Sequence, residues 1–586
     1  MSGAEVKGGV YLRIWVAGKQ ETLRTIARLN GVSVEEAAAL NPHIGHYDEE
    51  LAGSTVYLPS GTGIGTGIGT EAESGADERL KSPGRLPVCQ VQPPAVLDHW
   101  IPLKTLEEMA QEEYDVLIVG TGAGGGSVLW RLCEQWKTQR KRIGIIERGD
   151  SVIPTHARNL STMNQDRLTA YFNGLSEPLP GSSPSFQGAR QLFALGGRTL
   201  FWYAFAPRMP SWDLAQWPVP VEEMESYYGI AEQVMNVTES FAEGASFTEI
   251  LLQRLWMRGY SKASPLPVAA DIVPQVHGEL HTDMFTSSIS LLARALNQRP
   301  YDLAVNARAL QVLHAGGRVT GVKAAAPDKT EYTLKAKTVV VCASTFETPR
   351  LLLYSGIRSR ALGHYLTTHS FVQATGTIST LDFPIPWGPL NIMIPQSREN
   401  PYSVLLTGPE AFYWYPVAFE RPVQTETAVN FYGYGKIEPR YENHITLDPY
   451  KKDEYGVPEI KVHFSFSDKD WNVVHRMTEG IKRIAADAGI RLASRDGRPP
   501  ICLTPFGDLH HDSGTCRIGD DPRTSAAGPY GNIHGVAGLY AADNSVLPSI
   551  GAENNTLATI AQAIRTADHI ARQQGTGAVV RNRTPE

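Results

Sequence analysis

The chain has 586 residues, 42% of them hydrophobic, and a formal net charge of −7 at pH 7. This length exceeds what one hydrophobic core usually organises, so more than one domain is expected. The negative charge and the absence of any run of five Lys or Arg argue against nucleic acid as a partner, and no apolar stretch approaches the roughly 20 residues of a transmembrane helix. The five cysteines include no C-x-x-C pair, and we expect no metal site.

The first 60 residues predict a small module with the order strand, helix, helix, strand. Four apolar residues fall at helical spacing in its first helix: Leu23, Ile26, Ala27 and Leu29. Ser33 and Glu36 form a capping-box pattern that begins the second helix, which should end before Pro42. The N-terminus lacks the basic start, apolar core and cleavage site of a secretory signal, which predicts a cytoplasmic protein; export by a signal-independent route stays open.

This module resembles a lysin motif (LysM) domain. The matching segments are Glu21-Thr22-Leu23, Ile26-Ala27, Gly31-Val32-Ser33, Leu40-Asn41-Pro42 and Val56-Tyr57-Leu58-Pro59. The resemblance implies binding of glycans that contain N-acetylglucosamine, such as peptidoglycan or chitin. Gln20 and Glu21 stand where the motif usually has Gly and Asp. A role in docking a protein partner is therefore the alternative to glycan binding.

Residues 61–112 separate this module from the rest of the chain. Residues 61–84 contain a short Gly-Thr-Gly-Ile repeat and few bulky apolar residues, which predicts a flexible linker. Residues 85–112 are Pro-rich and then amphipathic. We expect them to form an arm along the surface of the domain that follows.

The segment from residue 114 to 149 predicts a strand, a glycine turn, a helix and a second strand. The strands are expected at residues 116–119 and 143–146, where the sequence is apolar and rich in β-branched residues. A glycine turn between a strand and a helix is typical of folds that bind a dinucleotide at the helix N-terminus.

Three glycines and one acid carry this interpretation. Gly120 allows the tight turn, Gly122 lets the backbone approach a pyrophosphate, and Gly125 lets the helix and strand pack closely. Glu147 lies 22 residues after Gly125, where a carboxylate can accept hydrogen bonds from a ribose diol. The strand context and the acid together make the pattern more specific than the glycines alone.

The C-terminal part holds three informative segments. Residues 509–519 read LHHDSGTCRIG, residues 538–543 read as a strand, and residues 545–570 lead into an amphipathic helix. Together with the glycine turn, they resemble the glucose-methanol-choline (GMC) family of flavin oxidoreductases, over roughly residues 113–575. The family's His-x-x-Gly-Thr-x-Arg-Met-Gly motif appears as His511, Gly514, Thr515, Arg517, Ile518 and Gly519, with Ile in place of Met.

Three further segments are similar to parts of the same family. Residues 338–357 resemble its buried strand and following helix, and residues 443–458 resemble the stretch that leads into the sheet of the substrate domain. Residues 195–213 resemble the loop that covers the flavin, in the form seen in pyranose oxidases. There, a His bonded covalently to the flavin occupies the position of Phe201, so the resemblance implies FAD held without a covalent bond.

The resemblance implies an α/β fold over residues 113–586. A Rossmann-like FAD-binding domain would be built from about residues 113–365 and 500–575. An interleaved α+β substrate domain would occupy about residues 366–499. The βααβ module of residues 1–60 would stand apart from both.

The resemblance also implies the site residues. His511 and Asn554 take the positions of the family's two catalytic residues. The expected cofactor-binding residues are Gly120, Gly122, Gly125, Glu147, Arg148, Gly197, Thr199, Trp202, Asp543, Asn555 and Thr556. Asp543 ends the segment 538–543, directly after the strand-like residues GLYAA, and could alternatively be an ordinary cap at the strand end. Trp202 and Phe205 are expected either in the pocket or in the core.

These residue types suit the oxidation of an alcohol. A base must remove the hydroxyl proton while a hydride leaves the same carbon, and histidine has a pKa suited to that task. An amide such as that of Asn554 can stabilise charge on the oxygen. The sequence thus predicts an FAD-dependent oxidase or dehydrogenase that acts on a CH–OH group, with a sugar or glycoside as the expected substrate.

Several alternatives stay open. The substrate could be a non-sugar alcohol, aromatic or aliphatic, and the electron acceptor could be oxygen, a quinone or a partner protein. A glycan-binding or scaffold protein with an inactive flavin domain is a second class of function, although intact His511 and Asn554 argue against it. An NAD-linked dehydrogenase is a weaker rival, because it has no need of the C-terminal segment that closes over a flavin.

Overall fold

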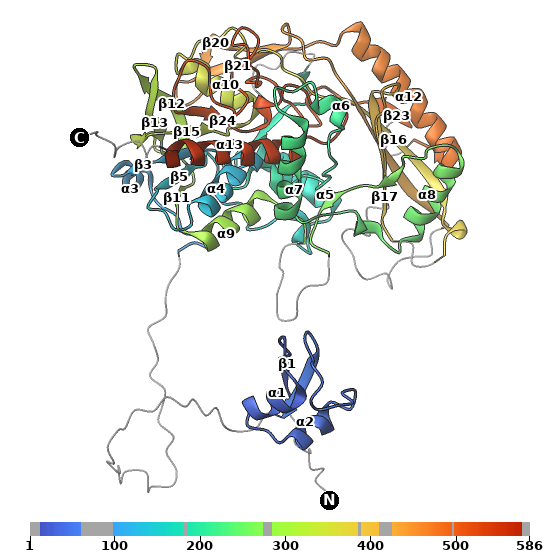
Figure 1. Cartoon of the computed structure of the whole chain (residues 1–586). Helices are drawn as coiled ribbons and strands as arrows, with labels where there is room; N and C mark the ends of the chain where they lie inside the picture. The colour runs from blue at the N-terminus through green and yellow to red at the C-terminus, as the bar shows by residue number, and fades with distance from the viewer. Residues whose placement is uncertain are drawn as a thin grey trace, which may run out of the picture. The chain divides into compact units, whose positions relative to one another are not determined.

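The computed structural model describes residues 12–59, 98–179, 186–272, 284–384, 388–408, 425–494, 497 and 499–576. The chain divides between Ala95 and Val96 into two compact units (Figure 1). The linker expected at residues 61–84 lies outside the described residues. No helix in the described ranges is long and apolar enough to cross a membrane.

The first unit contains the four expected elements in the expected order. They are β1 (Leu12–Val16), α1 (Leu23–Leu29), α2 (Val34–Leu40) and β2 (Thr55–Pro59), and the two strands pair antiparallel. Ser33 and Glu36 form the predicted capping box at the start of α2. Leu29 departs from the expected apolar face: it is 65% exposed, because it lies in the last turn of α1, outside the small core around Ile26 and Val56.

A five-stranded parallel sheet organises the second unit. Its order is β11-β5-β4-β15-β24. The strands are β4 (Val116–Val119), β5 (Ile143–Ile146), β11 (Asp302–Ala304), β15 (Val339–Val341) and β24 (Leu539–Ala541). β4 and β5 have the predicted bounds and are buried at every residue, as is typical of parallel strands covered on both faces.

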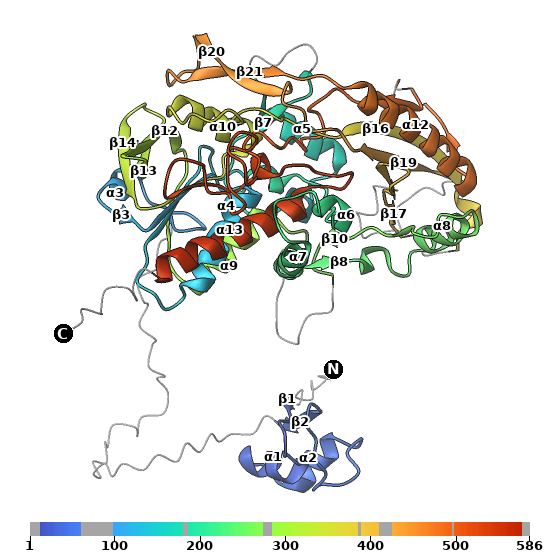
Figure 2. The ribbon, with the colours of Figure 1, turned by 45° about the horizontal axis from the view of Figure 1, so that its top comes forward.

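Three helices pack together beside this sheet, and the first of them contacts its strands. They are α4 (Ala123–Gln135), α9 (Ser288–Gln298) and α13 (Thr556–Thr576). α4 contacts β4 and β5 and packs against both α9 and α13 (Figure 2). The helix expected after the glycine turn and the C-terminal amphipathic helix thus lie side by side, although they come from opposite ends of the unit.

A four-stranded sheet adjoins the parallel one, with β13 in contact with β15. Its order is β12-β13-β14-β3. The strands are β3 (Glu113–Tyr114), β12 (Arg308–Ala315), β13 (Arg318–Ala325) and β14 (Glu331–Ala336). The end of the expected surface arm forms α3 (Leu106–Ala110), which packs on β14 through two buried residues, Leu106 and Met109.

A seven-stranded sheet forms the other part of the second unit. β22, β16, β19, β18, β17 and β9 follow in that order, and β23 also pairs with β16. The bounds are β9 (Ser264–Pro265), β16 (Ser370–Ser379), β17 (Leu390–Ile394), β18 (Tyr402–Gly408), β19 (Glu426–Gly435), β22 (Arg491–Leu492) and β23 (Ile501–Leu503). The sheet therefore takes β9 from before residue 366 and β23 from after residue 499, the limits expected for the substrate domain.

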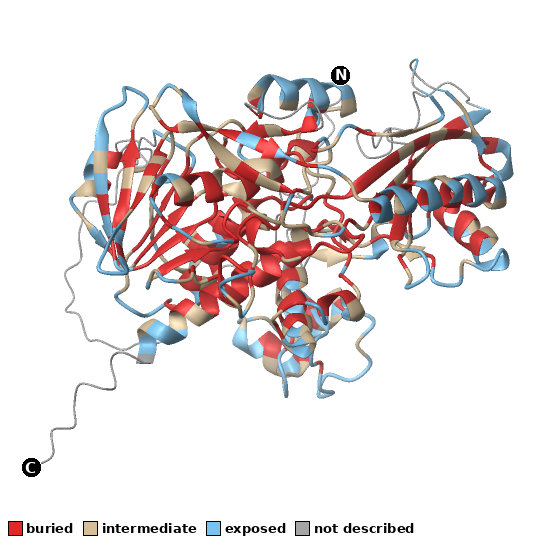
Figure 3. Ribbon diagram, turned by 90° about the horizontal axis from the view of Figure 1, so that it is seen from above, coloured by how far each residue is buried: buried red, intermediate tan, exposed pale blue. Residues whose placement is uncertain are grey.

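Two helices cover one face of this sheet, namely α8 (Ser246–Met257) and α12 (Asp468–Ala488). Val474, Met477 and Ile481 follow helical spacing and are buried against β16 and β19, whereas the opposite side of α12 is exposed (Figure 3). Because side chains alternate along a strand, the residues of β16 and β19 that do not meet α12 point to the other face of the sheet.

The remaining elements connect and flank these sheets. They are α5 (Gln165–Leu175), α6 (Ser211–Leu214), α7 (Val221–Met235), α10 (Ser344–Tyr354), β6 (Ser176–Pro178), β7 (Arg190–Leu192), β8 (Val237–Thr238), β10 (Val268–Ala269), β20 (His444–Lys452) and β21 (Pro458–His463). β20 and β21 form a two-stranded sheet of their own that packs on α10. They include most of residues 443–458, the segment that resembles the stretch leading into the family's substrate domain.

Candidate functional site

One cavity of about 930 Å³ brings most of the predicted residues together. The carboxyl ends of β4 and β5 line one end, which we call the nucleotide end; β16 and β19 line the other, which we call the sheet end. The predicted residues that line the cavity are Gly120, Gly122, Glu147, Arg148, Gly197, Thr199, Trp202, His511, Asp543, Asn554, Asn555 and Thr556. Phe205 also lines it, and Gly125 does not.

The glycine turn offers open space and free amides to the cavity. Gly120 has a φ of +99°, in the region that favours glycine. Gly122 directly precedes α4, and a Cβ at this position would meet nothing within 4 Å. No side chain caps the N-terminus of α4, so its first amides can bind an anion. This geometry fits the diphosphate of a dinucleotide.

Two glycines in the first turn of α4 hold the helix against neighbouring backbone. A Cβ at Gly125 would lie 1.9 Å from the carbonyl oxygen of Gly120, so Gly125 allows the close packing that was expected of it. A Cβ at Gly124 would lie 1.8 Å from the carbonyl oxygen of Ala542, directly after β24. No sequence pattern indicated this second contact, because it joins segments more than 400 residues apart.

Two carboxylates at strand ends also face the nucleotide end. Glu147 accepts hydrogen bonds from the backbone amide and the hydroxyl of Thr121, at 2.9 and 2.7 Å. Asp543 accepts one from the hydroxyl of Thr348 at 2.6 Å and caps the short helix Asn544–Val546. Burial raises the pKa of both carboxyls, and these hydrogen bonds act against it. Asp543 is therefore both a strand-end cap and a cavity residue.

The loop around residue 197 lies directly on the glycine turn. A Cβ at Gly197 would come within 3.1 Å of the Cα of Gly122. The hydroxyl of Thr199 accepts a hydrogen bond from the amide of Ser288 at 2.8 Å, and the indole of Trp202 donates one to the carbonyl of Thr286 at 2.8 Å. These bonds fix the loop against the start of α9.

Two further residues of this end have clear contacts. Arg148 places its guanidinium over the ring of Phe193, with 3.5 Å between the guanidinium carbon and the ring centroid. Phe201 is buried and lines the cavity, and its ring meets that of Phe172 edge-on at a centroid distance of 5.6 Å. Phe201 thus gives the cavity wall an apolar side chain with no atom able to bond a cofactor.

His511 lies at the wall of the cavity, partly exposed to it. Its Nδ1 is 3.0 Å from Nδ1 of His369, and the ring of Tyr434 stacks on it at a centroid distance of 5.7 Å. Burial, followed by the neighbouring His369, His510 and Arg198, lowers the pKa of His511 well below its ordinary value of 6.5. At neutral pH, His511 is therefore an uncharged base.

Asn554 and Asn555 occupy the loop that leads into α13. Asn554 lines the cavity, and its side chain forms a hydrogen bond with Tyr434. Asn555 donates from Nδ2 to the carbonyl of His511 at 3.2 Å and to the hydroxyl of Ser513 at 3.1 Å. Asn555, predicted only as a cofactor contact, thus also ties the start of α13 to the loop that carries His511.

The sheet end of the cavity is lined by residues that the sequence did not indicate. On β16 and β19 they are Phe371, Gln373, Thr375, Asn430, Tyr432 and Tyr434, and on α5 they are Gln165, Asp166, Leu168, Thr169, Phe172 and Asn173. Gln373 lies opposite Tyr432, and Thr375 opposite Asn430, in the antiparallel register. Amides and hydroxyls here alternate with aromatic rings, which suits a polar ligand with apolar faces.

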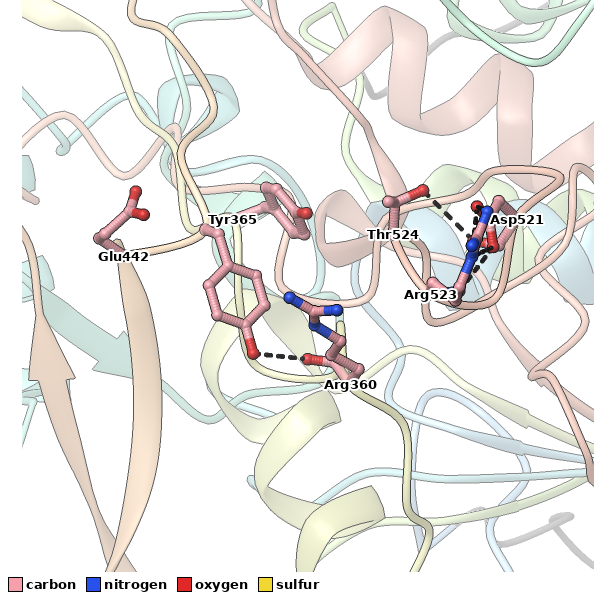
Figure 4. Close-up of a pocket in the computed structure, with 7 residues that line it drawn as sticks. Arg360, Tyr365, Glu442, Asp521, Arg523 and Thr524 are labelled. Atoms are coloured by element: carbon pink, nitrogen blue, oxygen red, sulfur yellow. Dashed lines mark hydrogen bonds and ion pairs between the residues drawn. The ribbon is translucent and has the colours of Figure 1, made fainter.

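A second, smaller cavity of about 370 Å³ contains none of the predicted residues. It is lined by Arg360, Tyr365, Tyr441, Glu442, Asp521, Arg523 and Thr524. Arg523 is paired with Asp521, and Glu442 points away from both (Figure 4). In the described ranges, no group of three or more His, Cys, Asp or Glu could hold a metal ion.

Comparison with known proteins points to one family. Residues 181–371 and 439–563, together more than half of the chain, match the N-terminal and C-terminal profiles of GMC oxidoreductases. The chain is similar to a C-glycoside 3-oxidase from Arthrobacter globiformis, at 26% identity over 400 residues, which are 65% of this chain and 74% of that protein.

A pyranose 2-oxidase from Tricholoma matsutake is 26% identical over 278 residues, 40% of this chain and 46% of that protein, so this match spans less than half of the relative. Among solved structures, formate oxidase from Aspergillus oryzae superimposes with a TM-score of 0.58 at 14% identity, over 79% of this chain and 99% of that chain. At this identity, the structural likeness concerns the fold alone.

Proposed function

Since the chain belongs to the GMC oxidoreductase family, we propose that it oxidises a CH–OH group of a sugar or glycoside. The observation that carries this proposal is the setting of His511: an uncharged base at the wall of the large cavity, which Asn554 also lines, with Tyr434 in contact with both. The named relatives that oxidise glycosides and pyranoses support the substrate class.

FAD is the cofactor of this family, and the nucleotide end of the cavity fits it. The free amides at the start of α4, the open space before Gly122 and the carboxylate of Glu147 suit a diphosphate and a ribose. Bound FAD supplies the hydride acceptor. The apolar Phe201 supports non-covalent binding, so acid precipitation should release the flavin into solution; flavin that stays with the pellet would contradict this.

Each polar residue of the site has a proposed task. Nε2 of His511 takes the proton of the substrate hydroxyl, which requires the ring to be uncharged beforehand. The amide of Asn554 donates a hydrogen bond to the same oxygen and stabilises the charge that develops there. Tyr434 stacks on His511 and hydrogen-bonds to Asn554, so it holds the two groups at a fixed separation.

The sheet end supports a substrate with several hydroxyls. Gln373 lines the cavity from β16, opposite Tyr432 of β19, and its side-chain amide can both donate and accept hydrogen bonds. Aromatic rings such as Phe205 and Tyr432 offer apolar surfaces close by. A sugar ring presents both hydroxyls and apolar faces and so matches this lining.

Anaerobic mixing with a panel of ligands tests the proposal. Sugars, C- and O-glycosides, and simple aromatic and aliphatic alcohols are compared by the rate at which the flavin absorbance bleaches. We expect reduction by a sugar or glycoside; reduction by simple alcohols alone would replace the substrate class, and reduction by none would overturn the function. Admitting air afterwards distinguishes oxygen from a quinone or protein as acceptor, by how fast the absorbance returns.

For the N-terminal unit, we propose a lysin motif that binds glycans or docks a protein, separately from catalysis. The βααβ order, the capping box and the hydrogen bonds of Glu21 to Trp15 and Gly18 are compatible with such a module. The full chain and a chain that starts at residue 96 should bleach their flavin at the same rate. Retention of only the full chain on peptidoglycan or chitin would favour glycan binding over docking.

A further inference from the structure

His369 lies behind His511, outside the cavity. It is 2% exposed and is absent from the residues that line the cavity, whereas His511 lines it. Backbone pairing sets this arrangement: Thr367 and Ser513 exchange two hydrogen bonds, at 3.0 and 2.8 Å, in an antiparallel bridge. In antiparallel pairing, the residue two positions after Thr367 lies opposite the residue two positions before Ser513. His369 therefore lies opposite His511.

The contact between the two rings has only two arrangements of hydrogens. Their Nδ1 atoms are 3.0 Å apart, so one must donate and the other must accept. Burial lowers the pKa of His369 to about 4 and that of His511 well below its ordinary value, so both rings are uncharged at neutral pH. Each ring therefore carries one hydrogen, and the contact decides which nitrogen of His511 bears it.

The proposed function selects one of the two arrangements. Nδ1 of His511 is used toward His369, so Nε2 is the nitrogen left to receive the hydroxyl proton in the proposed function. His511 must then carry its hydrogen on Nδ1 and donate it to Nδ1 of His369, which places the hydrogen of His369 on Nε2. That nitrogen is buried with no hydrogen-bond partner in the described ranges, and the nearby carbonyls of Ile550 and Gly551 raise the pKa of the ring against the effect of burial.

We propose that His369 is a positioning residue that fixes the tautomer of His511, leaving Nε2 of His511 bare toward the cavity. This inference rests on the proposed function, in which that nitrogen receives the proton of the substrate hydroxyl. When His511 takes up that proton it becomes a cation, and its Nδ1–H bond to His369 becomes charge-assisted and stronger. His369 thereby favours the proton transfer without touching the substrate.

The tautomer can be observed directly in the flavin-bound enzyme labelled with ¹⁵N-histidine. Nitrogen NMR distinguishes protonated from bare ring nitrogens, and a His511→Ala variant assigns the His511 signals. We expect His511 to be protonated at Nδ1 and bare at Nε2. A hydrogen on Nε2 in the parent enzyme would overturn the proposal, whether or not any alcohol reduces the flavin, so this test is separate from that of the proposed function.

Two variants of His369 then separate positioning from mere structural support. In His369→Leu, the new side chain cannot accept the hydrogen bond from Nδ1 of His511. In His369→Asn, the amide oxygen can accept it. In His369→Leu, we expect the maximal rate of flavin reduction to fall about 10- to 100-fold, the scale of one hydrogen bond to a charged group, with KM nearly unchanged because His369 does not line the cavity. His369→Asn should recover most of the rate.

His444→Leu is the matched control, because His444 lies on β20, stacked on His364 and His463 and outside the cavity. An unchanged His511 tautomer in His369→Leu would overturn the proposal, as would a loss of rate that His369→Asn does not recover. If His369→Leu does not fold with flavin bound, the parent spectrum and the His369→Asn variant still decide the question.

Discussion

The two ends of the large cavity are built in different ways. The nucleotide end consists mainly of backbone: the glycine turn, the amides at the start of α4 and the loop at Gly197. The sheet end consists of side chains on alternate positions of β16 and β19, together with α5. A backbone site needs glycine at fixed spacing, whereas a side-chain site can be lined by many residue types. The first therefore binds a constant ligand, and the second can change its substrate by substitution.

Gly125→Ala tests the backbone end and should have the largest effect. The new Cβ would lie 1.9 Å from the carbonyl oxygen of Gly120, so α4 must move away from β4 and the turn that receives the diphosphate must open. We expect a protein with little bound flavin, destabilised by roughly 1 to 3 kcal/mol, as measured by flavin absorbance per protein and by thermal unfolding. Gly174→Ala in α5 is the control, since its Cβ would meet nothing within 4 Å. Full flavin content in Gly125→Ala would show that close packing is not required.

His511→Ala tests the point where the two ends meet. Without the base, flavin reduction by substrate should slow by roughly 10²- to 10⁴-fold, the usual scale of general-base catalysis. Flavin should remain bound, because the glycine turn is untouched. Rapid-mixing spectroscopy under anaerobic conditions measures the rate. Reduction at the parental rate would remove His511 from the mechanism, and loss of flavin would assign it a structural role.

Gln373→Leu tests the side-chain end. The variant keeps the approximate volume of the side chain but removes its amide, so kcat/KM for the best sugar or glycoside should fall by roughly tenfold, the scale of one or two hydrogen bonds. Flavin content should be unchanged. Thr377→Val serves as the control. Thr377 is four residues after Gln373 on the same face of β16 and does not line the cavity. Equal kcat/KM values across the whole substrate panel would show that substrates do not reach β16.

A change of pH within the neutral range is expected to have the smallest effect on the rate of flavin reduction. His511 must be uncharged to accept a proton, and its pKa lies well below 6.5. The rate of flavin reduction should therefore be constant above about pH 6.5 and decrease only as the pH falls through the pKa of His511. Stopped-flow reduction at several pH values measures this. A rate that continues to rise above pH 8 would contradict an uncharged His511 at neutral pH.

The same contrast explains what could be predicted from the sequence. Strands β4 and β5 were predicted to the residue, because β4 is an apolar run that ends in a glycine turn and β5 is an apolar run that ends at Glu147. His511 and Asn554 were placed by a motif, and both line the cavity. The roles assigned to these residues stay predictions until they are tested.

The sheet end and His369 could not be predicted, for a physical reason. Their place depends on which strands pair and in which register, and the bridge between Thr367 and Ser513 joins segments about 150 residues apart. No local pattern distinguishes Gln373 or His369 from a residue of an ordinary half-buried strand. Leu29 was expected on the apolar face of α1 but is exposed. Helical spacing alone does not predict where a small core ends.

The contact between Gly124 and Ala542 has a consequence for how the enzyme is made. It joins the first turn of α4 to the residue after β24, and the sheet edge beside β15 stays unpaired until β24 arrives. A ribosome that has synthesised the glycine turn must still add more than 400 residues before the cofactor site can close. The site can therefore enclose FAD only when the chain is complete to about residue 542, late in synthesis or after it.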